Sequence, residues 1–125
     1  MAEMSDYLEN KILDYVLRDS ADWAPSTVYL ALHTASPADD EGGAEVDVAR
    51  QAIEFDAAHA TTGVTQNTNI ETFTSMPVAV VTHIGIWDHV SAGNLLYHTQ
   101  VTTSKAVLAG DTITVAAGAV TVTLA

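Results

Sequence analysis

The alternation of apolar and hydroxyl side chains at the end of this chain constrains its fold more than any other feature. Val120, Val122 and Leu124 fall on one face of an extended segment, and Thr121 and Thr123 fall on the other. A period of two is typical of a half-buried strand. Because chain ends fray unless the fold holds them, we expect this segment to pair within a sheet.

Similar segments precede it, separated by glycine-containing turns at 93, 110–111 and 118. Val28, Leu30 and Leu32 share one face of the first segment, and Ile53 and Phe55 are predicted to point inward. Residues 61–69 are polar and are predicted to form a turn. The expected strands cover residues 27–33, 50–55, 70–73, 78–87, 94–98, 105–108, 112–115 and 120–124. Such spacing favours a mainly β fold, an antiparallel β-sandwich resembling a jelly roll.

One helix is predicted, over residues 6–18. Asp6 and Glu9 form a capping-box-like start, in which Asp6 accepts hydrogen bonds from first-turn amides. An apolar stripe follows, made of Leu8, Ile12, Tyr15 and Val16. This stripe requires a sheet or a neighbouring subunit to cover it, so we expect these four residues to form an interface.

The chain of 125 residues is expected to form a single domain over residues 1–125, with the strands in 27–125. Sixteen acidic residues face four basic ones, and thirteen of the acids lie in residues 1–56. Nucleic acid is an unfavourable partner for such a chain, and no apolar run is long enough to span a membrane. The acidic N-terminus does not resemble a signal peptide, which predicts synthesis in the cytoplasm. The acid excess fits either simple solubility or a salt-loving host.

Metal sites receive little support from the sequence. The chain has no cysteine, and its five histidines form no recognised ligand motif. The acidic segment around Gly42 and Gly43 is the one candidate for Ca²⁺, through Asp39, Asp40, Glu41, Glu45 and Asp47. Its spacing does not match an EF-hand, so a solvated loop is the favoured alternative. We expect no cofactor.

Enzyme activity is not predicted. No G-x-S-x-G elbow or phosphate-binding glycine loop occurs, and Ser91 lies in a predicted turn. Trp23 and Trp87 are candidates for ligand binding, because an exposed indole offers a flat apolar face to a sugar ring. For Trp87 the alternative is a position in the core, beside Ile84 and Ile86.

Several stretches resemble, in order, a family of small tailed-phage proteins usually labelled phage tail fibre proteins. Residues 7–14 resemble the family's opening, and residues 28–37 resemble an early strand that ends in a Thr-Ala-x-Pro step. Residues 82–88 and 93–96 look like its T-H-x-G-I-x-D and G-N-L-L stretches. Its closing pattern is matched at residues 102–105, 110–111 and 116–119. The chain departs from the family in a heavier acid load and in fewer Gly and Asn within 51–70.

The resemblance implies a virion structural protein, made in the host cytoplasm, with no catalytic residues to transfer. The leading hypothesis is a capsid-surface decoration or turret subunit that assembles as a symmetric homo-oligomer. The alternative is a tail fibre or tail-tip protein that recognises the host. Expected partners are further copies of the chain, the major capsid protein or tail proteins, and a host surface glycan. A small hydrolase or metal-dependent enzyme is disfavoured by the missing motifs.

Overall fold

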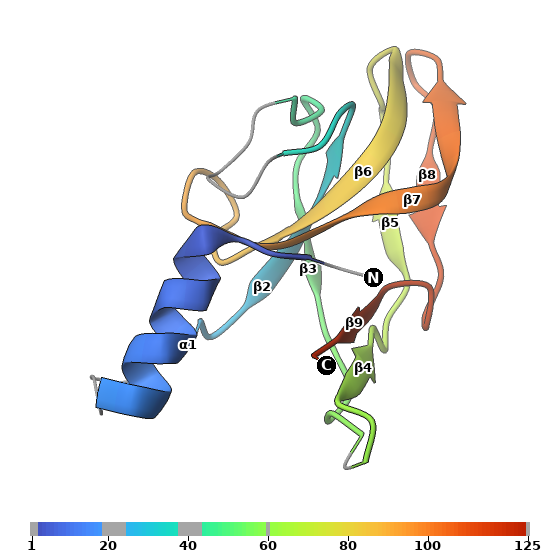
Figure 1. Ribbon diagram of the computed structural model, residues 1–125. Coiled ribbons are helices and arrows are strands. Elements are labelled where there is room, and N and C mark those ends of the chain that lie inside the picture. Colours follow the sequence, from blue (N-terminus) through green and yellow to red (C-terminus); the bar gives the residue numbers. More distant parts are fainter. Residues whose placement is uncertain (1–2, 19–24, 38–43, 60, 125) are drawn as a thin grey trace.

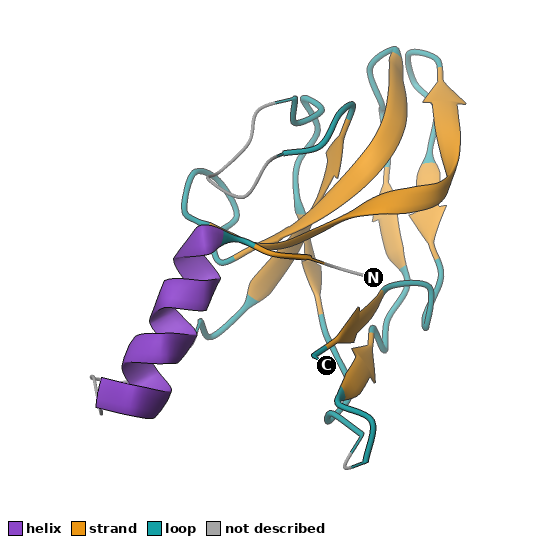
Figure 2. Cartoon of the chain, viewed as in Figure 1, coloured by secondary structure: helices purple, strands orange, loops and turns teal. Residues whose placement is uncertain are grey.

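The computed structural model describes residues 3–18, 25–37, 44–59 and 61–124 (Figure 1). One helix and nine strands are defined, and every strand pairing is antiparallel (Figure 2). The prediction of a mainly β fold with one N-terminal helix is therefore confirmed. The elements are β1 (Glu3–Met4), α1 (Asp6–Arg18), β2 (Val28–His33), β3 (Gln51–Ile53), β4 (Val64–Gln66), β5 (Glu71–Phe73), β6 (Ala79–Trp87), β7 (Leu95–Val107), β8 (Ile113–Val115) and β9 (Thr121–Thr123).

Five strands form the main sheet, in the order β1-β7-β6-β2-β3. Two separate ribbons, β4-β9 and β5-β8, complete the β structure. The last strand pairs with β4, with Val64 opposite Thr123 and Gln66 opposite Thr121, so the chain end is tied into a sheet as expected. A jelly-roll sandwich as such is not shown by this topology and stays a prediction.

Three details of the β structure differ from the sequence prediction. Residues 61–69 were expected to form a turn, but they contain β4, whose partner lies almost sixty residues later. The strands expected at 94–98 and 105–108 are parts of one long strand, β7. The polar residues between them, 99–104, show no apolar alternation and therefore gave no strand signal. The short strand β1 was not predicted at all.

The main core lies between one face of the five-stranded sheet and the two ribbons. Leu30 and Leu32 of β2 are buried there, together with Phe73 from β5 and Val122 from β9. Val28, Ile53 and Phe55 also pack against this core, as predicted. Leu124 is an exception, because its side chain is 50% exposed rather than buried beside Val122. The strand ends at Thr123, and although the Leu124 amide still donates to the Gly63 carbonyl at 3.0 Å, its side chain lies outside the core.

The helix has the predicted bounds but a different cap. Ser5, not Asp6, holds the first turn, since its hydroxyl accepts a hydrogen bond from the Leu8 amide at 3.2 Å. The same hydroxyl donates to the Leu95 carbonyl, which joins the helix start to β7. From there α1 runs away from the sheet (Figure 1). Among the described residues, no helix has the length and apolar character needed to cross a membrane.

Candidate functional site

Three of the five histidines share the face of the main sheet that lies opposite the core. His33 is paired directly with His83, and Gly85 is paired with His98. Directly opposite residues in an antiparallel pair project on the same side, and so do residues two apart along one strand. His33, His83 and His98 therefore lie on one face, which we call the histidine face.

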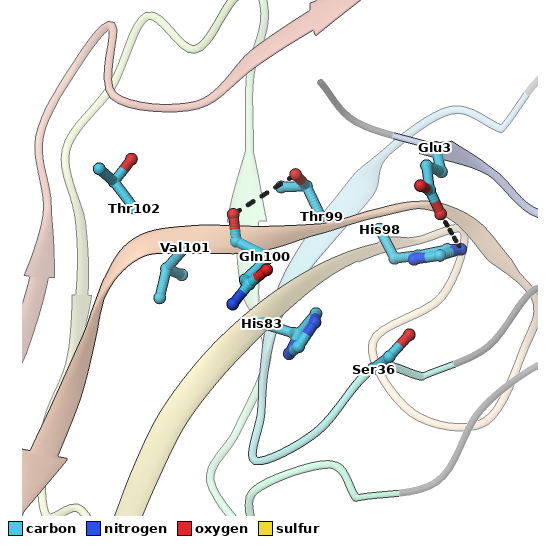
Figure 3. A pocket seen from close by; sticks show the side chains of 8 residues that line it. All are labelled: Glu3, Ser36, His83, His98, Thr99, Gln100, Val101 and Thr102. Atoms are coloured by element: carbon cyan, nitrogen blue, oxygen red, sulfur yellow. Dashed lines mark hydrogen bonds and ion pairs between the residues drawn. The ribbon is translucent and has the colours of Figure 1, made fainter.

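A polar groove lies on this face, with a volume of about 590 Å³ (Figure 3). Glu3 and His98 lie at one end, where a Glu3 carboxylate oxygen is 3.9 Å from His98 Nε2. His83 lines the groove from β6, and its Nδ1 is 2.8 Å from the Thr82 hydroxyl. The remaining lining residues are Ser36, Thr99, Gln100, Val101 and Thr102.

The groove owes its shape to an irregularity in β7. Val81 is paired with Lys105, whereas His83 is paired with Gln100. Residues 101–104 of β7 therefore face a single residue, Thr82, of β6. Such a bulge bends the strand and re-aims its side chains. The sequence contained a signal for this site, the uncharged hydroxyl-rich run at 99–104, but its polarity concealed the strand that carries it.

The lining chemistry suits a neutral or hydrogen-bonding ligand. Amide, hydroxyl and imidazole groups offer donors and acceptors, and Glu3 is the one carboxylate among the described lining residues. The part of the lining that the structure describes contains no lysine or arginine, so it offers no fixed positive charge to an anion. In the described part of the chain, no three His, Cys, Asp or Glu side chains are grouped to hold a metal ion.

Arg50 organises the other end of the histidine face. Its Nε and Nη2 each donate to an oxygen of Glu45 at 2.8 Å, and its Nη1 donates to the His89 and Ala92 carbonyls at 2.8 Å. The guanidinium also lies over the Trp87 ring, 4.0 Å from its centroid. This bidentate, stacked geometry ties the segment before β3 to the loop between β6 and β7.

The β6–β7 loop is held by its own side chains as well. Asp88 accepts hydrogen bonds from the Asn94 amide nitrogen at 2.7 Å and from its side chain at 3.0 Å. Gly93 has a positive φ of 75°, and a Cβ there would lie 2.5 Å from an Asp88 oxygen. Burial, and secondarily the Asp88 charge, raises the pKa of Tyr7. The G-N-L-L stretch thus has a structural role in this loop.

Gly85 serves close packing on the same face. A Cβ at this position would lie 2.9 Å from His33 Nε2 and 3.0 Å from Trp87 Nε1. The missing side chain leaves room for the His33 and Trp87 rings, which stack with centroids 6.2 Å apart. The glycine of the T-H-x-G-I-x-D stretch is therefore explained by packing rather than by ligand binding.

Two tryptophans, Trp23 and Trp87, were predicted as candidates for ligand binding. Trp87 is buried, with Arg50 over its ring and His33 stacked beside it. This placement favours the alternative of a core tryptophan, because protein groups occupy the face that a sugar would need. Trp23 lies outside the described residues.

The acidic candidate for Ca²⁺ is only partly described. Both carboxylate oxygens of Glu45 accept hydrogen bonds from Arg50, so this group is committed to a guanidinium. Asp47 is exposed. Asp39, Asp40 and Glu41 lie outside the described residues, and the calcium site stays a prediction.

The predicted helix stripe is divided between two environments. Leu8 is buried and Ile12 is half-buried, whereas Tyr15 is 52% and Val16 68% exposed. Leu13 and Leu17, which were not part of the stripe, are also exposed. The sheet thus covers only the first part of α1, and the last turns present apolar side chains to solvent.

Comparison with known proteins supplies an independent result. A family model described as "Podophage GP4 fiber I protein gp80" matches residues 3–123, nearly the whole chain. No curated protein matches the sequence.

Proposed function

Because the chain belongs to the Gp80 family of podophage GP4 fiber I proteins, we propose that it works at the tail of the particle, as a tail-fibre subunit. The family is one of structural fibre proteins and not of catalytic ones, so the chain is part of the virion. The observation that carries the proposal is the match over residues 3–123. It supports the tail-fibre alternative better than the capsid-surface interpretation that led the sequence analysis.

The expected partners follow from this position. Further copies of the chain and neighbouring tail proteins would contact its neutral and apolar surfaces. A host surface glycan is the proposed ligand of the polar groove. In support, the lining groups can donate to and accept from sugar hydroxyls, and none of the described lining residues is a lysine or arginine that would favour an anion instead.

Labelling of purified particles tests the position. An antibody against the chain, viewed by negative-stain electron microscopy, should mark the tail, and quantitative mass spectrometry should find about a dozen copies or fewer. Label over the head, with hundreds of copies per particle, would overturn the proposal and restore the capsid-surface hypothesis.

Ligand binding by the groove has a separate test. Saturation-transfer NMR with a panel of neutral mono- and disaccharides should give signals that weaken in Gln100→Ala and Thr102→Ala. Thr72→Ala is the matched control, because Thr72 is exposed on β5 and does not line the groove. Equal signals from all three variants, or no signal from any sugar, would remove the glycan from the proposal.

A further inference from the structure

An apolar patch is exposed at the far end of the β6–β7 pair. Val80 is directly opposite Ala106, and both point away from the core because Val81 and Val107 are buried in it. Val78 and Leu108 continue the same alternation just outside the two strands. Val78 is 71%, Leu108 69% and Val80 49% exposed. We call Val78, Val80, Ala106 and Leu108 the tip face.

The tip face is held in place by the turn beside it. The Met76 amide donates to the Asp111 carbonyl at 3.0 Å, and the Gly110 amide donates to the Met76 carbonyl at 2.7 Å. Asp111 also accepts a hydrogen bond from the Leu108 amide at 2.8 Å through its carboxylate. These bonds join Met76 to the turn at residues 108–111, and the pairing of Ala79 with Val107 places Val78 and Leu108 at adjacent ends of the two strands.

The distribution of charge favours a second copy of the chain as the partner of the tip face. The chain carries a net charge of −12, yet β6 and β8 contain no charged residue, β7 contains only Lys105, and the turn beside the tip face adds one carboxylate, Asp111. Two identical acidic molecules repel each other least where their charges are fewest. A contiguous exposed apolar surface at such a place is typical of a contact site.

The exposed end of α1 is the competing surface, and its charges argue against it. Leu13 and Leu17 share their side of the helix with Asp6 and Glu9, by the helical repeat. A second acidic copy that approached this side would meet two carboxylates. The helix also lies at the opposite end of the molecule from the tip face (Figure 1).

We infer that the tip face is a self-association surface, on which the same four residues of a second copy pack about a two-fold axis. A self-complementary patch is what a two-fold contact requires, since each residue set meets its own copy. This inference rests on the proposed self-association of the fibre subunit and assigns a surface to it. The molecular mass in solution tests it independently of where the chain lies on the particle.

Sedimentation equilibrium and light scattering on the full chain test this inference. The wild type should form a dimer, and its dissociation constant should fall as NaCl is raised, because salt screens the repulsion between copies. Val80→Glu and Leu108→Glu should each weaken association about tenfold or more. Leu13→Glu is the matched control: it also adds one carboxylate at an exposed leucine, and it should leave the dimer intact.

Crosslinking gives a second readout, since the chain has no cysteine of its own. Val80→Cys should form a disulfide-linked dimer under mild oxidation, whereas Leu13→Cys should not. Val80→Thr replaces one methyl group by a hydroxyl but keeps a β-branched side chain that suits a strand. Weaker association of this variant would therefore not reflect unfolding. A wild type that stays monomeric in high salt at millimolar concentration overturns the inference. So does a dimer that survives Val80→Glu or dissociates with Leu13→Glu.

Discussion

At the scale of single residues, Arg50 makes the largest set of interactions described for any side chain in this protein. It is 9% exposed, donates four hydrogen bonds and stacks on Trp87. Its partners come from the segment at Glu45 and from the β6–β7 loop, which is about forty residues away in the sequence. A buried charge with such partners is costly to remove, because Glu45 and two carbonyls would lose their donor.

We therefore expect Arg50→Ala to lower the free energy of unfolding by about 3 kcal/mol. Urea denaturation followed by Trp fluorescence measures this loss. Arg18→Ala is the control, since Arg18 pairs with Asp14 at 3.2 Å while its side chain is 76% exposed. An exposed pair of this kind contributes less than about 0.5 kcal/mol. Equal losses from the two substitutions would contradict the role assigned to Arg50.

Glu71 provides a pH-dependent prediction. Burial raises the pKa of its carboxyl above the ordinary 4.5, although a hydrogen bond from Asn69 acts in the opposite direction and Glu54 adds to the rise. The native state then binds more protons than the unfolded state between pH 4.5 and the raised pKa. Stability consequently falls as the pH rises through this window, and the loss persists at neutral pH.

Glu71→Gln removes this cost and keeps an acceptor for Asn69. The variant should melt at a higher temperature than the wild type at pH 7, and the difference should vanish as the pH falls well below 4.5, where the wild-type carboxyl is protonated in both states. Thermal unfolding by circular dichroism across this range checks both halves of the prediction. A variant less stable than the wild type at pH 7 would show that the carboxylate is favourable in the fold.

At the scale of elements, α1 depends on one residue that precedes it. Ser5 is 1% exposed and links the helix to β7 through the Leu95 carbonyl and the Leu8 amide. The helix has few other contacts with the sheet, because most of its apolar side chains beyond Ile12 are exposed. Its position therefore rests on the cap and on Leu8 more than on a long packed face.

Ser5→Ala should lower the free energy of unfolding by about 1 kcal/mol, the usual cost of a lost N-cap. Asp6→Ala, the residue that the sequence pattern favoured as cap, should cost about 0.3 kcal/mol through the helix dipole alone. Urea denaturation monitored at 222 nm compares the two variants. The reverse order of effects would return the cap to Asp6.

At the scale of the whole molecule, charge is distributed unevenly between the two halves of the chain. Of the sixteen acidic residues, thirteen lie in residues 1–56. In the strands from β4 onward, the only charged residues are Glu71 and Lys105. The net charge of −12 opposes the compact state by self-repulsion, and this repulsion is weakened by salt.

We expect the melting temperature to rise as NaCl is increased from 0.1 M to 1 M, because the screening length falls from about 10 Å to about 3 Å. The rise should be smaller in a variant that combines Glu9→Gln, Glu54→Gln and Asp56→Asn, three exposed acids. Scanning calorimetry measures both proteins. A melting temperature that falls with salt would contradict the repulsion argument and the hypothesis of a salt-loving host.

Sequence patterns predicted those features that depend on neighbours along the chain. The helix bounds follow from the spacing of Leu8 and Ile12, and the burial of Leu30 and Leu32 follows from strand alternation. The cap was assigned one residue too late, since Ser5 and Asp6 are both good N-cap residues and only the contact with Leu95 distinguishes them. The long strand β7 was divided in two, because residues 99–104 lack apolar alternation and pair through a bulge.

The amino-acid order by itself determined the secondary structure class, the strand faces and the charge asymmetry, because periodicity and composition are local properties. Only the tertiary structure decided that Arg50 is buried against Trp87, that three histidines share one face, and that the exposed Val78, Val80 and Leu108 lie together at the tip of β6 and β7. Each of these depends on pairing between segments far apart in the chain. Strand register brings such residues together, and spacing along the sequence does not encode it.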